Sequence, residues 1–314
     1  MSRIAIVVLA HNEARHIRRC LGSVAALQPQ VFVIDSGSTD GTADIARELG
    51  ATVLQHPFVN QAQQFQWALD NAPITAEWVM RLDADEVVEP DLAAEIAREL
   101  PRLPPHVTGV NLKRKHIFMG RWIRHGGRYP LVLLRIWRRG KARIEQRWMD
   151  EHMLLTEGRA VTFRGGFADV NLNDLNFFTE KHNRYATREA VDVINQRRGL
   201  FPRDTALAAG NSSAKAGLTR LLKERVYNRL PFEVSATAYF LLRYVVQLGF
   251  LDGREGAIYH FLQGYWYRFL VGAKVAELER ALGDLTGDAA LEKLAQLTGL
   301  PLAPAKDHPS GGAA

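Results

Sequence analysis

The chain has 314 residues, 47% of them hydrophobic, which is enough to bury a core and to form two domains. Basic residues outnumber acidic ones by 40 to 34, and the formal net charge of +6 suits an anionic ligand, a membrane surface or nucleic acid without choosing among them. The single cysteine, Cys20, excludes an internal disulfide framework and a zinc site built on several thiolates, and it fits a reducing compartment.

The first hundred residues alternate short apolar runs with segments of helical spacing. The apolar, largely β-branched runs predict strands at 3–10, 30–35, 52–55 and 77–82. The segments between and after them predict helices at 13–24, 42–49, 61–69 and 90–100. This order is typical of a parallel sheet covered by helices on both faces, and in such sheets ligands bind at the carboxyl ends of the strands.

The character of the sequence changes after about residue 109. Between Lys113 and Arg147 there are twelve Lys or Arg residues and one acid, Glu145. From Asn173 the spacing is helical to about residue 298, and it predicts helices near 174–196, 213–228, 234–249 and 255–283. No apolar stretch reaches the roughly 18 to 20 uninterrupted residues that a spanning helix needs, so we expect a soluble or peripheral protein.

Polar side chains follow three of the predicted strands. The stretch AHNE occupies 10–13, DSGSTDGT occupies 35–42, and DADE occupies 83–86. The first two are also what ordinary turns and helix N-termini use. Because parallel strands end at the same edge of a sheet, we expect the three loops to converge.

The DADE stretch carries the sharpest signal. Asp83 and Asp85 are two residues apart in extended geometry, so their carboxylates can face the same side, where they repel each other unless a cation joins them. Such oxygen ligands suit Mg²⁺ or Mn²⁺, which is usually shared with substrate phosphates; the alternative is a solvated acidic turn. Neither a G-x-G-x-x-G fingerprint after the first strand nor a G-x-x-x-x-G-K-[ST] loop is present, so metal and cations would handle any phosphates.

In this order and spacing the motifs AHNE, VIDSGSTDGT and RLDADE resemble the nucleotide-binding half of family-2 glycosyltransferases, over about residues 3–90. The resemblance implies an α/β fold of the A type, with a Rossmann-like, mostly parallel sheet, helices on both faces and a helical C-terminal region. The less specific stretches WMDEHM and FFTEKHNRYATREAVDVINQ extend the likeness to the bacterial branch of lipopolysaccharide or lipooligosaccharide core β-glucosyltransferases. The implied organisation is a nucleotide-sugar-binding and catalytic domain at 1–170, a helical region at 171–300 and a disordered tail at 301–314.

The same resemblance implies the donor pocket. Asp35 would hydrogen-bond a uracil-type base, Asp83 would lie near the ribose and metal, and Asp85 would ligate a Mg²⁺ or Mn²⁺ ion that bridges the two phosphates. Many relatives carry Lys or Arg before the fourth strand, and here we expect Gln61 and Gln64 to replace it by hydrogen bonding. The donor-binding residues are then Ala10, Asn12, Glu13, Asp35, Ser36, Gly37, Asp40, Gln61, Gln64, Asp83, Ala84 and Asp85.

An inverting transfer needs a base within hydrogen-bond reach of the acceptor hydroxyl. Alignment of Met-Asp-Glu in the WMDEHM stretch with the Val-His-Glu motif of the resembling enzymes favours Glu151, with Asp150 as the alternative, although both also fit a loop of exposed acids. Five further residues are expected on the acceptor side or, on the predicted helix, in ordinary packing: Trp148, His152, His182, Tyr185 and Arg188.

The implied acceptor is a glycolipid or polysaccharide. The basic stretch from Lys113 to Arg147 would hold anionic groups on it, or would be a solvated face. Aromatic residues beside Lys and Arg in the C-terminal helices are typical of interfacial membrane helices and equally of a helical subdomain with its own core. We therefore expect a cytoplasmic protein, at the inner face of the cell membrane if the first interpretation holds.

Two other functions are compatible with parts of the pattern. A sugar-phosphate nucleotidylyltransferase also joins a parallel sheet to acidic metal ligands, but it usually has a Gly-rich basic loop after the first strand, which LAHNEARH lacks. A nucleic-acid-binding module would use the basic stretch, but no nucleic-acid-binding motif occurs and the acidic strand ends would repel phosphate. We expect no nucleic-acid partner.

Overall fold

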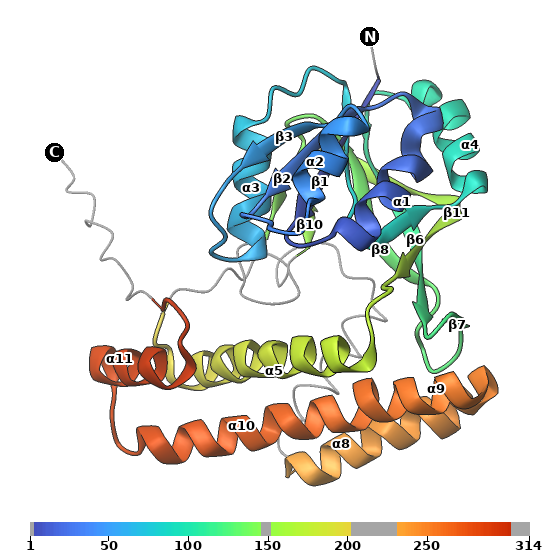
Figure 1. The fold of residues 1–314 in the computed structure, drawn as a ribbon. Coiled ribbons are helices and arrows are strands. Elements are labelled where there is room, and N and C mark those ends of the chain that lie inside the picture. Colours follow the sequence, from blue (N-terminus) through green and yellow to red (C-terminus); the bar gives the residue numbers. More distant parts are fainter. Residues whose placement is uncertain (1–2, 146–151, 202–230, 303–314) are drawn as a thin grey trace, which may run out of the picture.

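The computed structural model describes residues 3–145, 152–201 and 231–302. A sheet flanked by helices forms the N-terminal part, and long helices lie against one end of it (Figure 1). The A-type glycosyltransferase fold predicted above is confirmed: a curled mixed sheet with helices is followed by a helical region.

The first four strands are parallel and run in the order β3-β2-β1-β4. The strands are β1 (Ile4–Ala10), β2 (Gln30–Asp35), β3 (Thr52–Gln55) and β4 (Trp78–Arg81). The helices of this half are α1 (Ala14–Val24), α2 (Thr42–Glu48), α3 (Gln61–Asn71) and α4 (Pro90–Glu99), with short 3₁₀ turns at Ala25–Leu27 (η1) and Leu100–Arg102 (η2). Every strand and helix predicted here is present, with ends that agree within two residues.

The second half of the sheet is mainly antiparallel, so the expected mostly parallel order holds only for β1 to β4. Its strands are β5 (Glu86–Val88), β6 (Val107–Phe118), β7 (Arg121–Ile123), β8 (Leu131–Arg138) and β11 (Arg159–Val170). The full order is β3-β2-β1-β4-β8-β6-β11-β5, with β7 paired to β6. Only β6 and β11 are parallel in this half. A separate hairpin joins β9 (Ala142–Ile144) to β10 (Met153–Leu155).

The sheet must curl because of how β4 and β5 are joined. They are consecutive strands, but β8, β6 and β11 lie between them in the sheet. Four strand spacings measure about 19 Å in a flat sheet, whereas the link of residues 82–85 reaches roughly 17 Å even when fully extended. It is in fact a turn, closed by a hydrogen bond of 2.9 Å from Glu86 N to Asp83 O. The acidic turn therefore joins the two ends of the curl.

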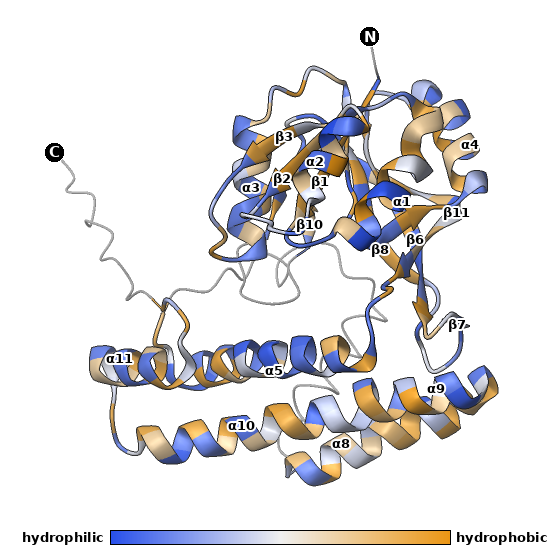
Figure 2. Cartoon of the chain, in the orientation of Figure 1, coloured by the Kyte–Doolittle hydropathy of each residue, from blue (hydrophilic) through white to orange (hydrophobic). Residues whose placement is uncertain are grey.

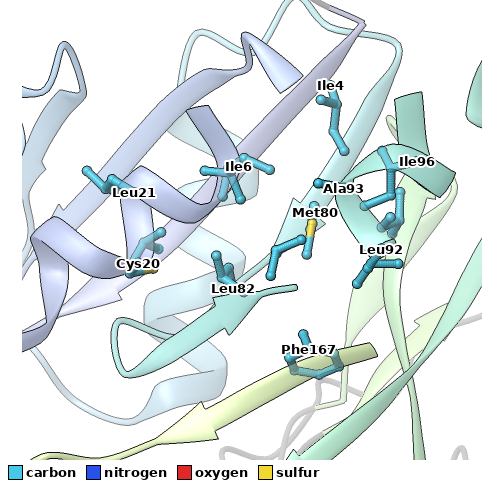
Figure 3. Close-up of a cluster of buried hydrophobic side chains, with 14 of the residues drawn as sticks. Ile4, Ile6, Cys20, Leu21, Met80, Leu82, Leu92, Ala93, Ile96 and Phe167 are labelled. Carbon is cyan, nitrogen blue, oxygen red and sulfur yellow. The ribbon is translucent and has the colours of Figure 1, made fainter. Parts of the chain in front are cut away.

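The largest part of the core packs beneath this turn. Figure 3 shows Met80 of β4 and Leu82, which directly follows β4, facing Leu92 of α4 and Phe167 of β11, and all four are fully buried. Burial of each such side chain contributes about 1.5–3 kcal/mol. Cys20 on α1 is buried as well, and its Sγ lies 3.5 Å from Asp83 O. The apolar core thus continues up to the acidic turn and fixes it from below.

The C-terminal region is helical. Its α-helices are α5 (Leu175–Arg198), α8 (Phe232–Leu241), α9 (Gly253–Tyr259), α10 (Tyr267–Leu282) and α11 (Gly287–Thr298). A π-helical segment η4 (Leu242–Val246) and a 3₁₀ turn η5 (Gly249–Asp252) follow α8, and a second π-helical segment η6 (His260–Trp266) joins α9 to α10. Helices α5, α10 and α11 share a buried apolar cluster.

Three of the four predicted helices after residue 173 are thus observed. The fourth, at 213–228, lies outside the described residues, as does most of the predicted tail at 301–314. Within the described ranges, no single helix is both long and apolar enough to cross a bilayer; Phe232–Val246 and Gly249–Leu282 meet that criterion only as a pair, with a bend of 69° between them.

Candidate functional site

A cavity of about 1070 Å³ lies between the carboxyl ends of β1 and β4 and the C-terminal helices. Five of the predicted donor-binding residues line it: Glu13, Gln61, Asp83, Ala84 and Asp85. The other seven are not among its lining residues: Ala10, Asn12, Asp35, Ser36, Gly37, Asp40 and Gln64. The first and third motifs, AHNE and DADE, therefore meet at the cavity, and none of its lining residues comes from DSGSTDGT.

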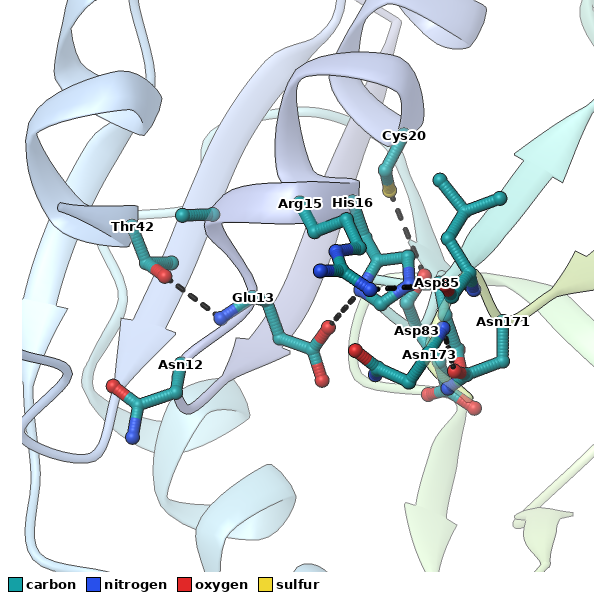
Figure 4. A network of polar contacts seen from close by, with 12 residues as sticks. Asn12, Glu13, Arg15, His16, Cys20, Thr42, Asp83, Asp85, Asn171 and Asn173 are labelled. Carbon is teal, nitrogen blue, oxygen red and sulfur yellow. Dashed lines mark hydrogen bonds and ion pairs between the residues drawn. The ribbon is translucent and has the colours of Figure 1, made fainter. Parts of the chain in front are cut away.

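The first two polar loops are bonded to each other. Asn12 has a left-handed backbone with φ 56°; its N–H donates to Ser38 Oγ at 2.8 Å, and its Oδ1 accepts from Thr39 N at 2.8 Å. Glu13 N donates to Thr42 Oγ1 at 2.8 Å, a contact visible in Figure 4. These bonds hold the start of α1 against the start of α2 and so set the direction of the Glu13 side chain.

Two aspartates of the second loop are held by protein donors. Asp35 is buried and accepts from Ser38 N at 3.1 Å and from Gln55 Nε2 at 2.8 Å. Asp40 Oδ2 accepts from Ala14 N at 2.9 Å. Burial raises the pKa of Asp40, but hydrogen bonds from Thr42 and Ala14 outweigh it and lower the pKa below its usual value. The contact of Asp35 with a uracil base stays a prediction.

The remaining loop residues leave open space beside this network. Ser36 donates from both N and Oγ to Ala10 O, at 3.0 and 3.3 Å. Gly37 has φ 81°, a conformation that favours glycine, and no heavy atom lies within 4 Å of the position a Cβ would take. The loop can therefore accept a ligand close to its backbone.

The two glutamines expected to replace a basic residue differ in their surroundings. Gln64 is buried, with Oε1 2.6 Å from His56 Nδ1 and Nε2 donating to His56 O at 3.1 Å. Gln61, at the start of α3, lines the cavity. Gln64 fixes the loop at residue 56, so Gln61 is the better placed of the two for a sugar contact.

Asp83 is surrounded by arginines. Its Oδ1 lies 3.3 Å from Arg81 Nε and its Oδ2 lies 3.4 Å from Arg135 Nη2. Burial raises the pKa of Asp83, but Arg81, Arg135 and Arg114 together hold it well below its usual range. Asp83 is thus ionised and already carries counter-charges from the protein.

The pKa of Asp85, unlike that of Asp83, is raised. Asp85 accepts a hydrogen bond of 3.0 Å from Asn171 Nδ2, shown in Figure 4. Burial raises the pKa of Asp85, and the nearby carboxylates of Asp169, Asp83 and Glu13 raise it further, with Lys181 as the opposing positive charge. Of the two motif aspartates, Asp85 is the one whose ionised form needs an added cation.

The residues that line the cavity fit a Mg²⁺ or Mn²⁺ ion whose coordination is completed by the substrate. In the described parts of the chain, no group of three or more His, Cys, Asp or Glu side chains converges as a closed metal centre. Mg²⁺ is commonly bound through one or two carboxylates, with substrate phosphates and waters supplying the rest. Asp85, short of positive charge beside the cavity, matches that arrangement, and Asp83 stands next to it.

Several cavity residues were not anticipated from the sequence. Asp169 on β11 lines the cavity, with Oδ2 3.1 Å from His116 Nδ1 and 3.9 Å from Arg114 Nη1. Burial raises the pKa of Asp169, but His116 and Arg114 outweigh it and lower the pKa below its usual range. Arg114 on β6 and Lys181 on α5 also line the cavity, and both contribute to the lowered pKa of Asp169. The only advance signal was the density of Arg and Lys after residue 113.

The first residue of β5 also plays an unexpected part. Glu86 is buried, with Oε1 2.6 Å from Arg135 Nη2 and 3.6 Å from Arg114 Nη1. Burial raises the pKa of Glu86 to about 8, with Asp83 adding to the rise and Arg135 opposing it. Glu86 therefore belongs to the interior of the curl and does not start the next helix.

The side chain of His16 connects Glu13 to the segment that leads into α5. The buried His16 has Nδ1 2.5 Å from Glu13 Oε2, and its Nε2 accepts from Leu172 N at 2.9 Å. Because Nε2 accepts a backbone hydrogen, the ring proton lies on Nδ1 and is donated to Glu13. These two hydrogen bonds hold the segment between β11 and α5 against the edge of the sheet.

On the acceptor side, two of the three residues predicted on α5 reach the cavity. His182 and Tyr185 line it, and Arg188 does not; its guanidinium carbon lies 6.0 Å from the Tyr185 ring centre. Burial lowers the pKa of His182, whose Nδ1 donates to Phe178 O at 2.7 Å. His152 is half exposed, 3.6 Å from Glu145. Trp148, Asp150 and Glu151 lie outside the described residues.

Comparisons with known proteins agree with this geometry. The chain is 35% identical over 96 residues to an uncharacterized glycosyltransferase of Rickettsia felis, a match that covers 31% of this chain and 33% of that protein, so it spans about a third of that relative. It is 25% identical over 209 residues to the lipopolysaccharide core biosynthesis glycosyltransferase LpsC of Rhizobium meliloti, covering 64% of this chain and 74% of LpsC.

Among solved structures, the mannosyltransferase PcManGT from Pyrobaculum calidifontis, in complex with GDP-Man and Mn²⁺, is similar over 87% of both chains, with a TM-score of 0.51. At 17% identity this likeness concerns the fold alone. Residues 5–170, more than half of the sequence, match the family model for glycosyl transferase family 2. The chain therefore belongs to glycosyl transferase family 2.

Proposed function

We propose that the protein is an inverting, metal-dependent glycosyltransferase. It moves a hexose, glucose or a similar sugar, from a UDP-sugar to a hydroxyl of a glycolipid or polysaccharide in the synthesis of lipopolysaccharide or another cell-surface glycan. The observation that carries this is the carboxylate group around one cavity, in which burial and neighbouring carboxylates raise the pKa of Asp85 despite Lys181, while arginines and His116 hold the pKa values of Asp83 and Asp169 low. A nucleoside diphosphate with its divalent cation supplies both the missing charge and the remaining ligands.

Different residues of the chain would bind the metal ion and act as the base. Asp85, with Asp83 beside it, would hold the Mg²⁺ or Mn²⁺ ion, which when bound stabilises negative charge on the departing diphosphate. Asn171 fixes the orientation of Asp85 through its 3.0 Å hydrogen bond. Glu151, with Asp150 as the alternative, would take the proton from the acceptor hydroxyl as its oxygen attacks the anomeric carbon. The product would have the inverted anomeric configuration.

The family relationship favours this function over the two alternatives raised by the sequence. The match spans the sheet and all three strand-end loops, which a nucleic-acid-binding module would not need. The similarity to LpsC supports an acceptor of the lipopolysaccharide core type. UDP as the nucleotide follows from the resemblance of the motifs.

We also propose a cytoplasmic location with attachment to the inner face of the cell membrane. Nine large apolar side chains are 44–69% exposed on α8 and the segments that follow it, where Figure 2 shows extended hydrophobic colouring: Val234, Leu241, Leu242, Val245, Val246, Leu248, Phe250, Leu251 and Phe261. Three exposed arginines lie near this surface, and they would pair with anionic lipid headgroups: Arg121, Arg124 and Arg254. An apolar face bordered by cations is typical of interfacial membrane binding.

A donor titration tests the function. Binding of UDP-glucose and other nucleotide sugars is measured by calorimetry with Mn²⁺ and with EDTA, and transfer is followed on a glycolipid extract with analysis of the anomeric configuration. We expect metal-dependent binding of a UDP-sugar and an inverted product. Tight binding to DNA or RNA together with no binding of any nucleotide sugar would refute the proposal.

A further inference from the structure

Three arginines converge on the side of the cavity that is formed by the helices. Arg128 precedes β8, Arg243 lies in η4 and Arg268 lies in α10, and all three line the cavity. The guanidinium carbons of Arg243 and Arg268 lie 5.4 and 5.3 Å from the Tyr239 ring centre. Arg128 lies 5.3 Å from the Tyr259 ring centre. We define Arg128, Arg243 and Arg268 as the arginine cluster.

Arg243 is the most constrained member of the arginine cluster. It is only 4% exposed; its Nε donates to Gly126 O at 2.8 Å and its Nη1 donates to Tyr239 Oη at 3.3 Å. Its third nitrogen, Nη2, is buried and has no hydrogen-bond partner among the described residues, and the same holds for Arg128 Nε. A buried, charged donor left without a partner is energetically unfavourable. These two donors, fixed beside an open cavity, are explained by a ligand that accepts hydrogen bonds.

The charge around the cluster leads to the same conclusion. Arg268 is balanced by Glu189, with Nη1 3.0 Å from Oε1. Within the described parts of the chain, neither Arg128 nor Arg243 forms an ion pair with a carboxylate. Burial raises the pKa of Tyr239, but Arg243, Arg268 and Arg128 outweigh it and lower the pKa below its usual value. The helix side of the cavity therefore carries two arginines, Arg128 and Arg243, whose charge no carboxylate of the described residues pairs.

We infer that the arginine cluster is a second binding subsite, which holds a phosphate or carboxylate group of the acceptor. Guanidinium groups suit such anions because their planar donors bind two oxygens at once. The donor diphosphate is expected at Asp83 and Asp85 on the sheet side, so the anion at the helices belongs to the second substrate. This inference rests on the proposed transferase function for the identity of that substrate, and it assigns an anionic acceptor instead of a neutral one.

The test uses small anions on the full chain saturated with UDP and Mg²⁺. Glycerol 3-phosphate represents a phosphate-bearing acceptor and gluconate a carboxylate-bearing one; glycerol and glucose are their uncharged counterparts. Calorimetry at constant ionic strength is expected to show binding of at least one anion and of neither uncharged compound. The anion that binds more tightly identifies which of the two groups the acceptor carries.

Two variants locate the binding. Arg243→Gln is expected to weaken anion binding at least tenfold while UDP binding with Mg²⁺ stays unchanged. Arg128→Gln provides the same test with little risk to folding, since no side-chain hydrogen bond of Arg128 is seen in the described structure. The control is Arg184→Gln, because Arg184 is exposed on α5 and does not line the cavity. It should bind the anions as the unaltered protein does.

The outcomes separate this inference from the proposed function. The inference is overturned if neither anion binds with or without UDP, or if both cluster variants bind the anions as tightly as Arg184→Gln. It is also overturned if the anions bind only in the absence of UDP, which would assign the arginines to the donor. Absence of UDP binding would instead count against the proposed function. The anion titration is then repeated without UDP, and its result alone decides the existence of the subsite.

Discussion

Arg135 Nη2 on β8 lies 2.6 Å from Glu86 Oε1 at the start of β5, and both side chains are buried. In the sheet, β6 and β11 separate these two strands. The ion pair therefore crosses the inside of the curl and ties the end of the acidic turn to the strand beside β4. Arg135 also lies 3.4 Å from Asp83 Oδ2, so one guanidinium orients both sides of the turn.

This pair predicts a large loss of stability when one partner is removed. Arg135→Met leaves Glu86 buried without its nearest cation, and above pH 8, where the Glu86 carboxyl of the unaltered protein is ionised, we expect the free energy of unfolding to fall by about 3–5 kcal/mol. Urea denaturation measures it. The double variant Arg135→Met with Glu86→Leu should recover a substantial part of that loss. A single variant that loses less than about 1 kcal/mol would show that Arg114 alone suffices for Glu86.

The metal assignment predicts that Asp85→Asn abolishes function without unfolding the chain. The amide keeps the shape and can still accept from Asn171, but it removes the charge that would bind the cation, so transfer should fall about 100-fold or more. Mn²⁺-dependent UDP binding by calorimetry should fall with it. Asp91→Asn, on the exposed start of α4, is the matched control. Undiminished Mn²⁺-dependent binding in Asp85→Asn would refute the assignment.

The assignment of the base predicts a separation between binding and turnover. Glu151→Gln should keep UDP-sugar affinity and lose about 10²–10⁴-fold in transfer rate, because the acceptor hydroxyl no longer gives up its proton to a carboxylate. Single-turnover kinetics with a glycolipid extract measure the rate. If Asp150→Asn loses the rate and Glu151→Gln keeps it, the base is Asp150.

Membrane attachment predicts that charge on the apolar surface weakens lipid binding. Val246 and Phe250 are 69% and 46% exposed, and their joint replacement by Glu should lower partitioning onto anionic vesicles at least tenfold. Co-sedimentation measures it. Leu49→Glu places one such charge on an exposed leucine of the sheet domain and should have no effect. Equal sedimentation of all three proteins would contradict the proposal.

His260 predicts a dependence of stability on pH. It is fully buried, and burial lowers its pKa to about 4; Arg243 and, more weakly, Arg128 and His125 add to this, while Asp252 opposes it. The unfolded chain therefore binds a proton between pH 6.5 and 4 that the folded chain rejects. The contribution of His260 to the free energy of unfolding is fully present above pH 6.5. It is lost as the pH falls toward 4, by at most about 3 kcal/mol.

Comparison of two histidine variants isolates that contribution. In His260→Gln the difference in unfolding free energy between pH 7 and pH 5 should shrink relative to the unaltered protein, because the buried titrating group is gone. In His106→Gln, where the exposed ring contacts Arg159, the difference should persist. Chemical denaturation at each pH gives both values. Identical pH profiles for His260→Gln and the unaltered protein would contradict the argument.

The parallel half of the fold could be predicted because local pattern determines it. Apolar runs such as 30–35 end in polar loops, and the strand and its following helix pack as one unit. The convergence of Glu13 and Asp85 on one edge follows from that topology alone. The acidic turn was recognised for the same reason, since its carboxylates lie two residues apart on the chain.

The antiparallel half could not be predicted in this way. Strands β6 and β11 carry charged residues, Arg114 and Asp169, at positions that line the cavity, so their apolar alternation is broken there. Asp169 reaches Asp85 only because β11 pairs with β5, a contact across more than eighty residues of sequence. The arginines that distinguish Asp83 from Asp85 come from β4, β6 and β8. No local signal in the motif reveals which of the two carboxylates the arginines surround.

The four residues between β4 and β5 serve as a clasp for the curled sheet. One added residue there would shift the register of β5 against β11 and turn the side chain of Glu86 away from Arg135. The distance between the two carboxylates is therefore set by the closure of the sheet as well as by their chemistry. A sequence change in this turn that suits a different ligand must also keep the sheet closed. We therefore expect the residues that determine substrate choice to vary on the helical side of the cavity, where no strand pairing restricts them.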